Sequence, residues 1–105
     1  LTETWNGSNW TEVNDLNTAR ESLTGTGATN TASLAVGGTT GSVTGATESW
    51  NGTNWTEVND LNTARNSLAG AGTNALAVVF GGSSPTQGTT EEWAETGGTK
   101  TISTD

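Results

Sequence analysis

Twelve consecutive residues occur twice in this chain without a change. Residues 9–20 and residues 54–65 both read NWTEVNDLNTAR, and the second copy begins 45 positions after the first. An internal repeat with a period of about 20–50 residues is typical of arrays of small structural units. We therefore expect a chain built from copies of one unit rather than one irregular domain.

Each period contains an apolar run that ends in two glycines. The runs are TASLAV at residues 31–36 and NALAVVF at residues 74–80, followed by the pairs Gly37-Gly38 and Gly81-Gly82. A short run with Val or Phe that is closed by glycine predicts a strand. Because the second run is apolar almost without interruption, we expect its strand to be buried on both faces.

An Asn-Gly turn separates two tryptophans twice in the chain. Trp50 and Trp55 flank residues 51–54 (NGTN), and Trp5 and Trp10 flank the similar segment NGSN. Asn-Gly between strand-like runs is a strong hairpin signal, because both residues tolerate positive φ. A four-residue loop places each pair of tryptophans directly opposite on antiparallel strands, where an aromatic pair contributes roughly 0.2–1 kcal/mol.

The rest of each period supplies two more strands. WTEV follows the Asn-Gly turn and predicts a strand, NDLNTAR predicts a polar bend, and SLTGTGA or SLAGAGT predicts a strand of small residues. Glycine within a strand indicates close approach of another backbone. Four short antiparallel strands in each period are the signature of a propeller blade. The alternative is a β-solenoid, whose repeats are usually shorter and whose strands are parallel.

This pattern resembles the Kelch repeat, in which an apolar strand ends in Gly-Gly, an aromatic residue and a later Trp follow, and an Arg opens the next strand. The matching residues are Gly81, Gly82 and Trp93 in one copy, and Gly37, Gly38, Trp50, Trp55 and Arg65 in the other. Trp stands here where the family usually has Tyr, and the spacing to the second Trp is shorter. The resemblance implies a β-propeller in which the four glycines are structural, together with Trp5, Trp50 and Trp93.

The amino-acid sequence of the repeat also resembles repeats of a second group of proteins. WNGTNWTEVNDLNTAR is similar to repeats in structural or tail-associated proteins of aquatic phages and in bacterial surface proteins. This resemblance implies an extracellular or virion-surface location.

The register of the repeat predicts how the chain divides. Residues 1–20 are expected to supply the last two strands of a blade, residues 21–65 one full period, and residues 66–105 a further blade with a fourth strand at residues 99–104. The total is about two and a half blades, whereas a propeller typically has about 4–8. We therefore expect the ring to be closed by a homo-oligomer or by the remaining blades of a longer parent chain. We therefore expect the chain to be a fragment, a processed product or a design.

Charge and composition exclude several classes of partner. Eleven acidic residues face three basic ones, which gives a net charge of −8. Nucleic acid and anionic membrane surfaces both require Lys and Arg, so neither is an expected partner. No apolar run approaches the length of a membrane span. The chain has no Cys, so disulfides and thiolate metal sites are excluded.

The residues that remain for catalysis are carboxylates, since the chain has no His, Cys or Tyr. The candidate pairs are Glu48 with Glu57, and Glu91 with Glu92. Neighbouring strand residues point to opposite faces, so the second pair is poorly placed to cooperate. The acidic positions recur in each repeat, which favours an architectural role. We therefore expect that the chain is not an enzyme.

The Asn-Asp-Leu-Asn bends lack the spacing of a calcium loop, so we expect no metal and no cofactor.

Arginine and the remaining tryptophans are the candidate binding residues. Arg20 and Arg65 are expected to form ion pairs or hydrogen bonds near a blade junction. The alternative places them at a channel mouth, where they bind an anion. Trp10 and Trp55 are the candidate stacking surface for a sugar, against the alternative that they complete a thin core.

Three functional hypotheses follow from these observations. The first is a non-enzymatic β-propeller module of a virion- or surface-associated protein, which displays loops for recognition. The second is a glycan-binding propeller with one site per blade. The third is an engineered or reconstructed propeller fragment that assembles into a closed ring.

Overall fold

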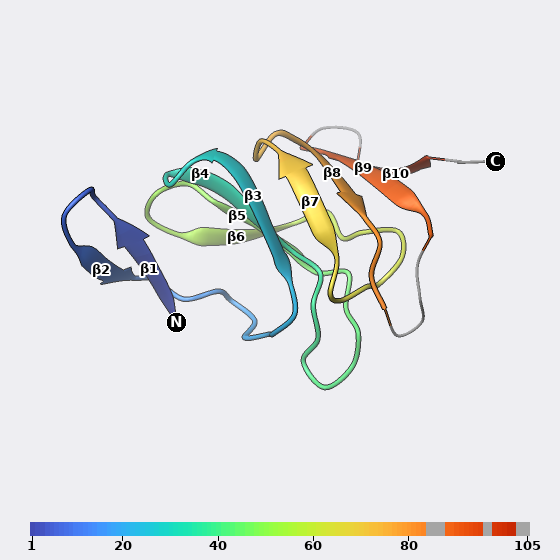
Figure 1. Ribbon diagram of the computed structural model, residues 1–105, viewed down its shortest axis with the longest axis horizontal. Coiled ribbons are helices and arrows are strands. Elements are labelled where there is room, and N and C mark those ends of the chain that lie inside the picture. The colour runs from blue at the N-terminus through green and yellow to red at the C-terminus, as the bar shows by residue number, and fades with distance from the viewer. Residues whose placement is uncertain (84–87, 96–97, 103–105) are drawn as a thin grey trace.

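The computed structural model describes residues 1–83, 88–95 and 98–102 of the chain, and these residues form antiparallel strands without any helix (Figure 1). The strands are β1 (Thr2–Trp5), β2 (Trp10–Val13), β3 (Thr24–Thr29), β4 (Ala32–Val36), β5 (Thr47–Trp50), β6 (Trp55–Val58), β7 (Ala69–Gly72), β8 (Leu76–Phe80), β9 (Thr90–Ala94) and β10 (Gly98–Ile102). The expected all-β antiparallel organisation is confirmed. Within the described ranges, nothing helical is long and apolar enough to cross a bilayer.

The strands are arranged in three sheets whose neighbours are consecutive in the chain. The first sheet is β1-β2, the second is β3-β4-β5-β6, and the third is β7-β8-β9-β10. The sheets follow one another along the 46 Å axis of the molecule, with the β1–β2 hairpin at one end (Figure 1). Each four-stranded sheet is an up-and-down meander, as the repeat predicts.

The two Asn-Gly hairpins have the predicted register. Trp5 pairs with Trp10 and Trp50 pairs with Trp55, with ring centroids 5.3 Å and 5.1 Å apart. The side-chain oxygen of the first Asn accepts hydrogen bonds from two backbone amides of the turn in both hairpins. The Gly that follows has φ of 100° or 97°. Local turn chemistry therefore fixes which tryptophans face each other.

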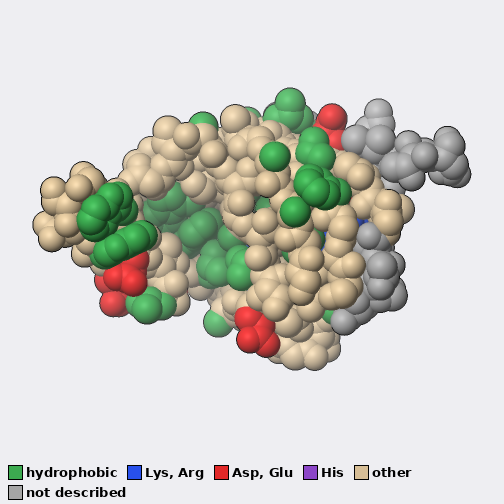
Figure 2. All heavy atoms as spheres, in the orientation of Figure 1, with side chains coloured by type: hydrophobic (Ala, Val, Ile, Leu, Met, Phe, Trp, Pro, Cys, Tyr) green, Lys and Arg blue, Asp and Glu red, His purple; other side chains and the backbone are tan. Residues whose placement is uncertain are grey.

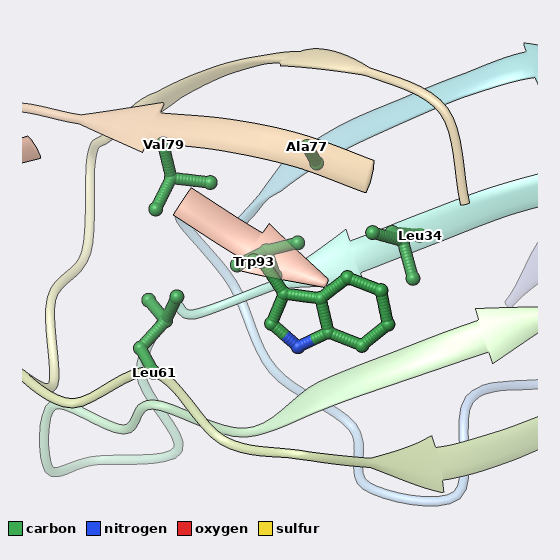
Figure 3. Close-up of a cluster of buried hydrophobic side chains, with 6 residues drawn as sticks. Leu34, Leu61, Ala77, Val79 and Trp93 are labelled. Atoms are coloured by element: carbon green, nitrogen blue, oxygen red, sulfur yellow. The ribbon is translucent and has the colours of Figure 1, made fainter. Parts of the chain in front are cut away.

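The hydrophobic core lies between the second and third sheets. Its side chains gather around the indole of Trp93 (Figure 3). They are Leu34 and Val36 from β4, Leu61 from the bend after β6, Ala77 and Val79 from β8, and Trp93 from β9. The inner strands β3 and β7 also touch, because a Cβ built on Gly70 lies 3.2 Å from the Thr24 methyl group. One sheet therefore packs face to face on the next.

The structure corrects one prediction about β8. Residues 74–80 were expected to form a strand buried on both faces, but only the face of Ala77 and Val79 is buried. On the opposite face Leu76 is 55% exposed and Phe80 is 45% exposed. The apolar pattern predicts a second covering layer, but no described residues bury Leu76 and Phe80 on this face, where Val78 is partly buried. The predicted last strand at residues 99–104 corresponds to β10, and residues 103–104 lie outside the described part.

Candidate functional site

Two bends of identical sequence lead from one sheet into the next. Residues 14–20 connect β2 to the second sheet, and residues 59–65 connect β6 to the third. Each bend ends in an arginine whose side chain enters the sheet that follows. We call these segments the first and second arginine bends.

Arg65 is held by a fork of hydrogen bonds inside the third sheet. Its Nη1 donates to the carbonyls of Gly81 (3.0 Å) and Thr89 (2.8 Å). Its Nη2 donates to the Thr89 hydroxyl (3.0 Å) and to Oε2 of Glu91 (2.7 Å). The Arg65 and Glu91 side chains have no exposed surface. The planar guanidinium suits this arrangement, because its donors diverge in fixed directions.

Arg20 makes the corresponding contacts in the second sheet. Its Nη1 donates to the carbonyls of Gly37 (3.1 Å) and Ala46, and its Nη2 donates to the Ala35 carbonyl (3.2 Å). Nη2 also pairs with Oε2 of Glu48 at 3.2 Å. Burial lowers the pKa of the Arg20 guanidinium, and the charge of Glu48 opposes that change. The predicted ion pairs of the two arginines are confirmed, and their partners are Glu48 and Glu91.

The two buried carboxylates also bind the backbone of the bends. Glu91 accepts hydrogen bonds from the amides of Asn62 (2.6 Å) and Thr63 (3.2 Å). Glu48 accepts from the equivalent amides of the first bend, at 2.7 Å and 3.4 Å. Each joint therefore contains one carboxylate, one guanidinium and two backbone amides, and we call it the Arg–Glu lock. These amide contacts were not predicted from the sequence, although an acid two residues before Trp in each repeat is a signal for them.

The glycine pairs lie where the arginine bends approach the sheets. All four glycines have positive φ, from 69° at Gly37 to 120° at Gly82. A Cβ on Gly37 would lie 2.6 Å from the Arg65 carbonyl oxygen. The corresponding Cβ on Gly81 would meet no atom of the described residues within 4 Å. The same sequence position is thus tightly packed in the second sheet and open in the third. The remaining glycine of the first pair, Gly38, donates its amide to the Arg65 carbonyl at 2.9 Å.

The tryptophans fall into a buried and an exposed group. Trp50 and Trp93 are buried, and their indole N–H groups donate to the carbonyls of Asn30 (3.1 Å) and Asn59 (2.8 Å). Trp55 is half-buried. Trp5 is 45% exposed and Trp10 is 65% exposed. Trp5 therefore differs from Trp50 and Trp93, although it occupies the same place in the repeat.

Four of these indoles surround one hollow. A cavity of about 330 Å³ lies between the β1–β2 hairpin and the hairpin of β5 and β6. Its lining, which we call the tryptophan hollow, consists of Trp5, Trp10, Trp50 and Trp55 with Thr2, Glu3, Thr4, Val13, Asn30 and Ser33. Asn30 also donates to the Trp5 carbonyl at 3.2 Å and so ties the two hairpins together. A mostly apolar wall with a few polar groups is typical of a ligand site.

A larger opening lies between the β1–β2 hairpin and the inner strands of the second sheet. Its volume is about 830 Å³. Apolar side chains are visible in the recess beside the hairpin (Figure 2). We call it the strand cleft. Its lining comes from the start of β1, from the first bend, from the region of β3 and β4, and from β6. The lining residues are Leu1, Thr2, Asp15, Leu16, Asn17, Ala19, Arg20, Leu23, Gly25, Thr26, Gly27, Ser33, Leu34, Ala35 and Trp55.

The structure therefore does not gather the predicted site residues into one site, although Arg20 and Trp55 both line the strand cleft. Arg20 and Arg65 lie in the Arg–Glu locks, where four of the five guanidinium N–H donors bind protein oxygens. Trp10 and Trp55 lie in the tryptophan hollow.

Comparison with known proteins assigns neither a family nor a function, because neither a family model nor a curated protein matches the chain.

Proposed function

We propose that the chain is a non-enzymatic structural and recognition module of a β-propeller, in a virion- or surface-associated protein. The observation that carries this proposal is the repetition of the Arg–Glu lock. Arg20 with Glu48 and Arg65 with Glu91 join three successive sheets by the same set of contacts. A joint that is repeated and closed to solvent serves to hold units together.

The sheets have the shape expected of propeller blades. Each full unit is a four-stranded antiparallel meander packed face to face on its neighbour, which is the construction of a blade. In this proposal the chain holds about two and a half blades, and the ring of about 4–8 is completed by further copies or by other blades of a longer chain. The exposed loop after Gly38, at residues 40–42, is the part offered for recognition.

The state of the carboxylates supports a non-enzymatic role. Glu57 lies directly opposite Glu48. Both oxygens of Glu48 are already hydrogen-bonded to Arg20 or to the first bend. A general acid or base must reach the reacting group, and Glu48 faces only the protein. The location at an extracellular or virion surface follows from the sequence resemblance.

A crystal structure of the assembled protein tests this proposal. Sheets arranged radially around a common axis, each locked to the next through Arg and Glu, are the expected result. An open stack without an axis, or a solenoid of parallel strands, would contradict it.

A second candidate function is glycan binding, and the tryptophan hollow is the observation that favours it. Sugar rings stack on exposed aromatic faces. Of the four indoles that line this hollow, those of Trp5 and Trp10 are exposed, and the polar side chains of Glu3 and Asn30 line the same hollow. Trp10 is the most exposed of the four. It can therefore be replaced with little effect on the fold.

Binding to a glycan array tests this second function. We expect the wild type to bind and Trp10→Ala to lose binding, with an unchanged far-ultraviolet circular dichroism spectrum. The mutation Glu95→Gln, at an exposed residue directly after β9 that does not line the hollow, is the control and should bind as the wild type does. Absence of binding by the wild type would remove the glycan hypothesis and leave the structural one intact.

A further inference from the structure

The strand β1 lacks a partner that its counterparts have. Among the described strands, β1 pairs only with β2. In the second sheet β5 pairs with β6 and also with β4, and in the third sheet β9 pairs with β10 and also with β8. The strand cleft lies beside this free edge, because Leu1 and Thr2 line it. A free strand edge offers unpaired backbone groups to another strand.

The junction between the second and third sheets shows what occupies an equivalent cleft. There the bend residue Leu61 is 6% exposed and packs with Leu34 and Val36 of β4. Its counterpart in the first bend, Leu16, lies in an identical sequence but is only half-buried and lines the strand cleft. The missing cover is therefore an inner strand pair that presents an apolar face like that of β4.

The chain carries such a face, and it is exposed. Leu76, Val78 and Phe80 of β8 occupy the positions of Ala32, Leu34 and Val36 of β4, as the pairing of both strands with their neighbours shows. Leu34 and Val36 are buried by the third sheet. The equivalent face of β8 is left largely open. The cleft and this face are the two halves of an interface that the chain already makes once.

The strand that now covers the edge of β8 has a close relative in β1. β9 begins Thr-Glu-Glu-Trp and β1 reads Thr-Glu-Thr-Trp. Glu91 and Trp93 of β9 are buried in the lock and in the core. Glu3 and Trp5 of β1 have the same spacing and are exposed. β1 thus carries the side chains that the place of β9 requires.

We propose that the chain assembles with a second copy of itself by exchange of these strands. β1 of one copy pairs with β8 of the other in place of β9, and the β7–β8 hairpin fills the strand cleft. Glu3 then occupies the position of Glu91 opposite Arg65, and Trp5 that of Trp93. Exchange of equivalent elements between copies is a low-cost route to assembly. This inference rests on the proposed function, and it identifies a second copy of the chain as the partner that completes the propeller.

The exchange also determines the size of the assembly. Each copy has one cleft and one β7–β8 hairpin, so the contact is head to tail, and the blade arrangement proposed above closes it into a ring. The assembly then has two four-stranded sheets for each copy. One is the second sheet of that copy, and the other combines β1 and β2 of one copy with β7 and β8 of the next. A propeller of about 4–8 blades therefore needs about two to four copies.

The mass of the protein in solution, measured by light scattering after gel filtration, tests the inference. We expect a discrete oligomer of the 10.6 kDa chain. The mutation Trp5→Ala should abolish the oligomer, because Trp5 must fill the place of the buried Trp93. Trp10→Ala is the matched control, since it removes an exposed indole from the same hairpin, and it should leave the oligomer intact. Circular dichroism checks that both variants fold.

A monomeric wild type at every concentration overturns the inference, and so does an oligomer that Trp5→Ala leaves unchanged. A synthetic peptide of residues 67–82, which contains β7 and β8, separates this failure from failure of the proposed function. If a monomeric chain binds the peptide, a flanking repeat of a longer chain fills the cleft and the blade proposal stands. If it neither assembles nor binds the peptide, both proposals fail.

Discussion

Arg65 and Glu91 form an ion pair of 2.7 Å in which neither side chain is exposed. Removing one partner of such a pair leaves a buried charge without compensation, which costs about 3–5 kcal/mol. We therefore expect Arg65→Ala to lower the free energy of unfolding by about that amount. Urea unfolding followed by tryptophan fluorescence measures the loss, because the core indole of Trp93 lies in the same sheet.

An exposed ion pair in the same chain is the control for this mutation. The amino group of Leu1 lies 3.4 Å from Asp15, and both groups are more than half exposed. Ion pairs in solvent contribute only about 0–1 kcal/mol. Asp15→Asn should therefore leave the unfolding curve almost unchanged. If Arg65→Ala proves as mild as Asp15→Asn, the lock does not hold the sheets together.

At the scale of the element, two glycines in equivalent positions differ only in their surroundings. Gly37 and Gly81 have φ of 69° and 75°, so alanine meets a similar backbone strain at both. A Cβ added to Gly37 would lie 2.6 Å from the Arg65 carbonyl oxygen, whereas one added to Gly81 would meet no described atom within 4 Å. We expect Gly37→Ala to lower the melting temperature clearly more than Gly81→Ala. Equal shifts in dilute monomeric protein would show that the second bend does not pack on Gly37.

The two arginine bends provide a second matched pair. Leu61 is buried in the core, and Leu16 in the first bend is half-buried. Truncation of a buried leucine costs about 2–5 kcal/mol. We expect Leu61→Ala to lose that much stability in the monomer and Leu16→Ala to lose clearly less, as urea unfolding would measure. Equal losses would mean that the strand cleft is already filled.

These pairs also show why sequence predicts part of this structure and not the rest. The strands and the facing tryptophans could be predicted, because turn chemistry and alternation act within a few residues. The burial of β8 on both faces was predicted wrongly, since it depends on a layer that its own residues do not encode. Leu16 and Leu61 lie in identical twelve-residue segments. Only the neighbouring sheet makes one of them a core residue, so no local pattern could distinguish them.

At the scale of the whole molecule, the sheets form a row with two unlike ends. The strand cleft opens at the β1–β2 end. The exposed face of Leu76 and Phe80 belongs to the third sheet at the other end. Complementary surfaces on opposite ends of one chain lead to head-to-tail contacts rather than to a contact of one surface with the same surface of its partner. In the assembly proposed above, each further sheet is held by the same Arg–Glu lock as the sheet before it.

Salt should strengthen the assembly proposed above. Each copy carries a net charge of −8, so copies repel one another when the Debye length is about 30 Å at 0.01 M salt, and much less when it is about 3 Å at 1 M. The contact itself joins apolar surfaces, which screening does not weaken, and the ion pair of Glu3 with Arg65 takes the buried place of Glu91, where screening is slight. Sedimentation of the wild type should therefore shift towards the oligomer as sodium chloride is raised. Dissociation on adding salt would indicate an interface held by exposed charges, which is incompatible with docking of the Leu76 and Phe80 face.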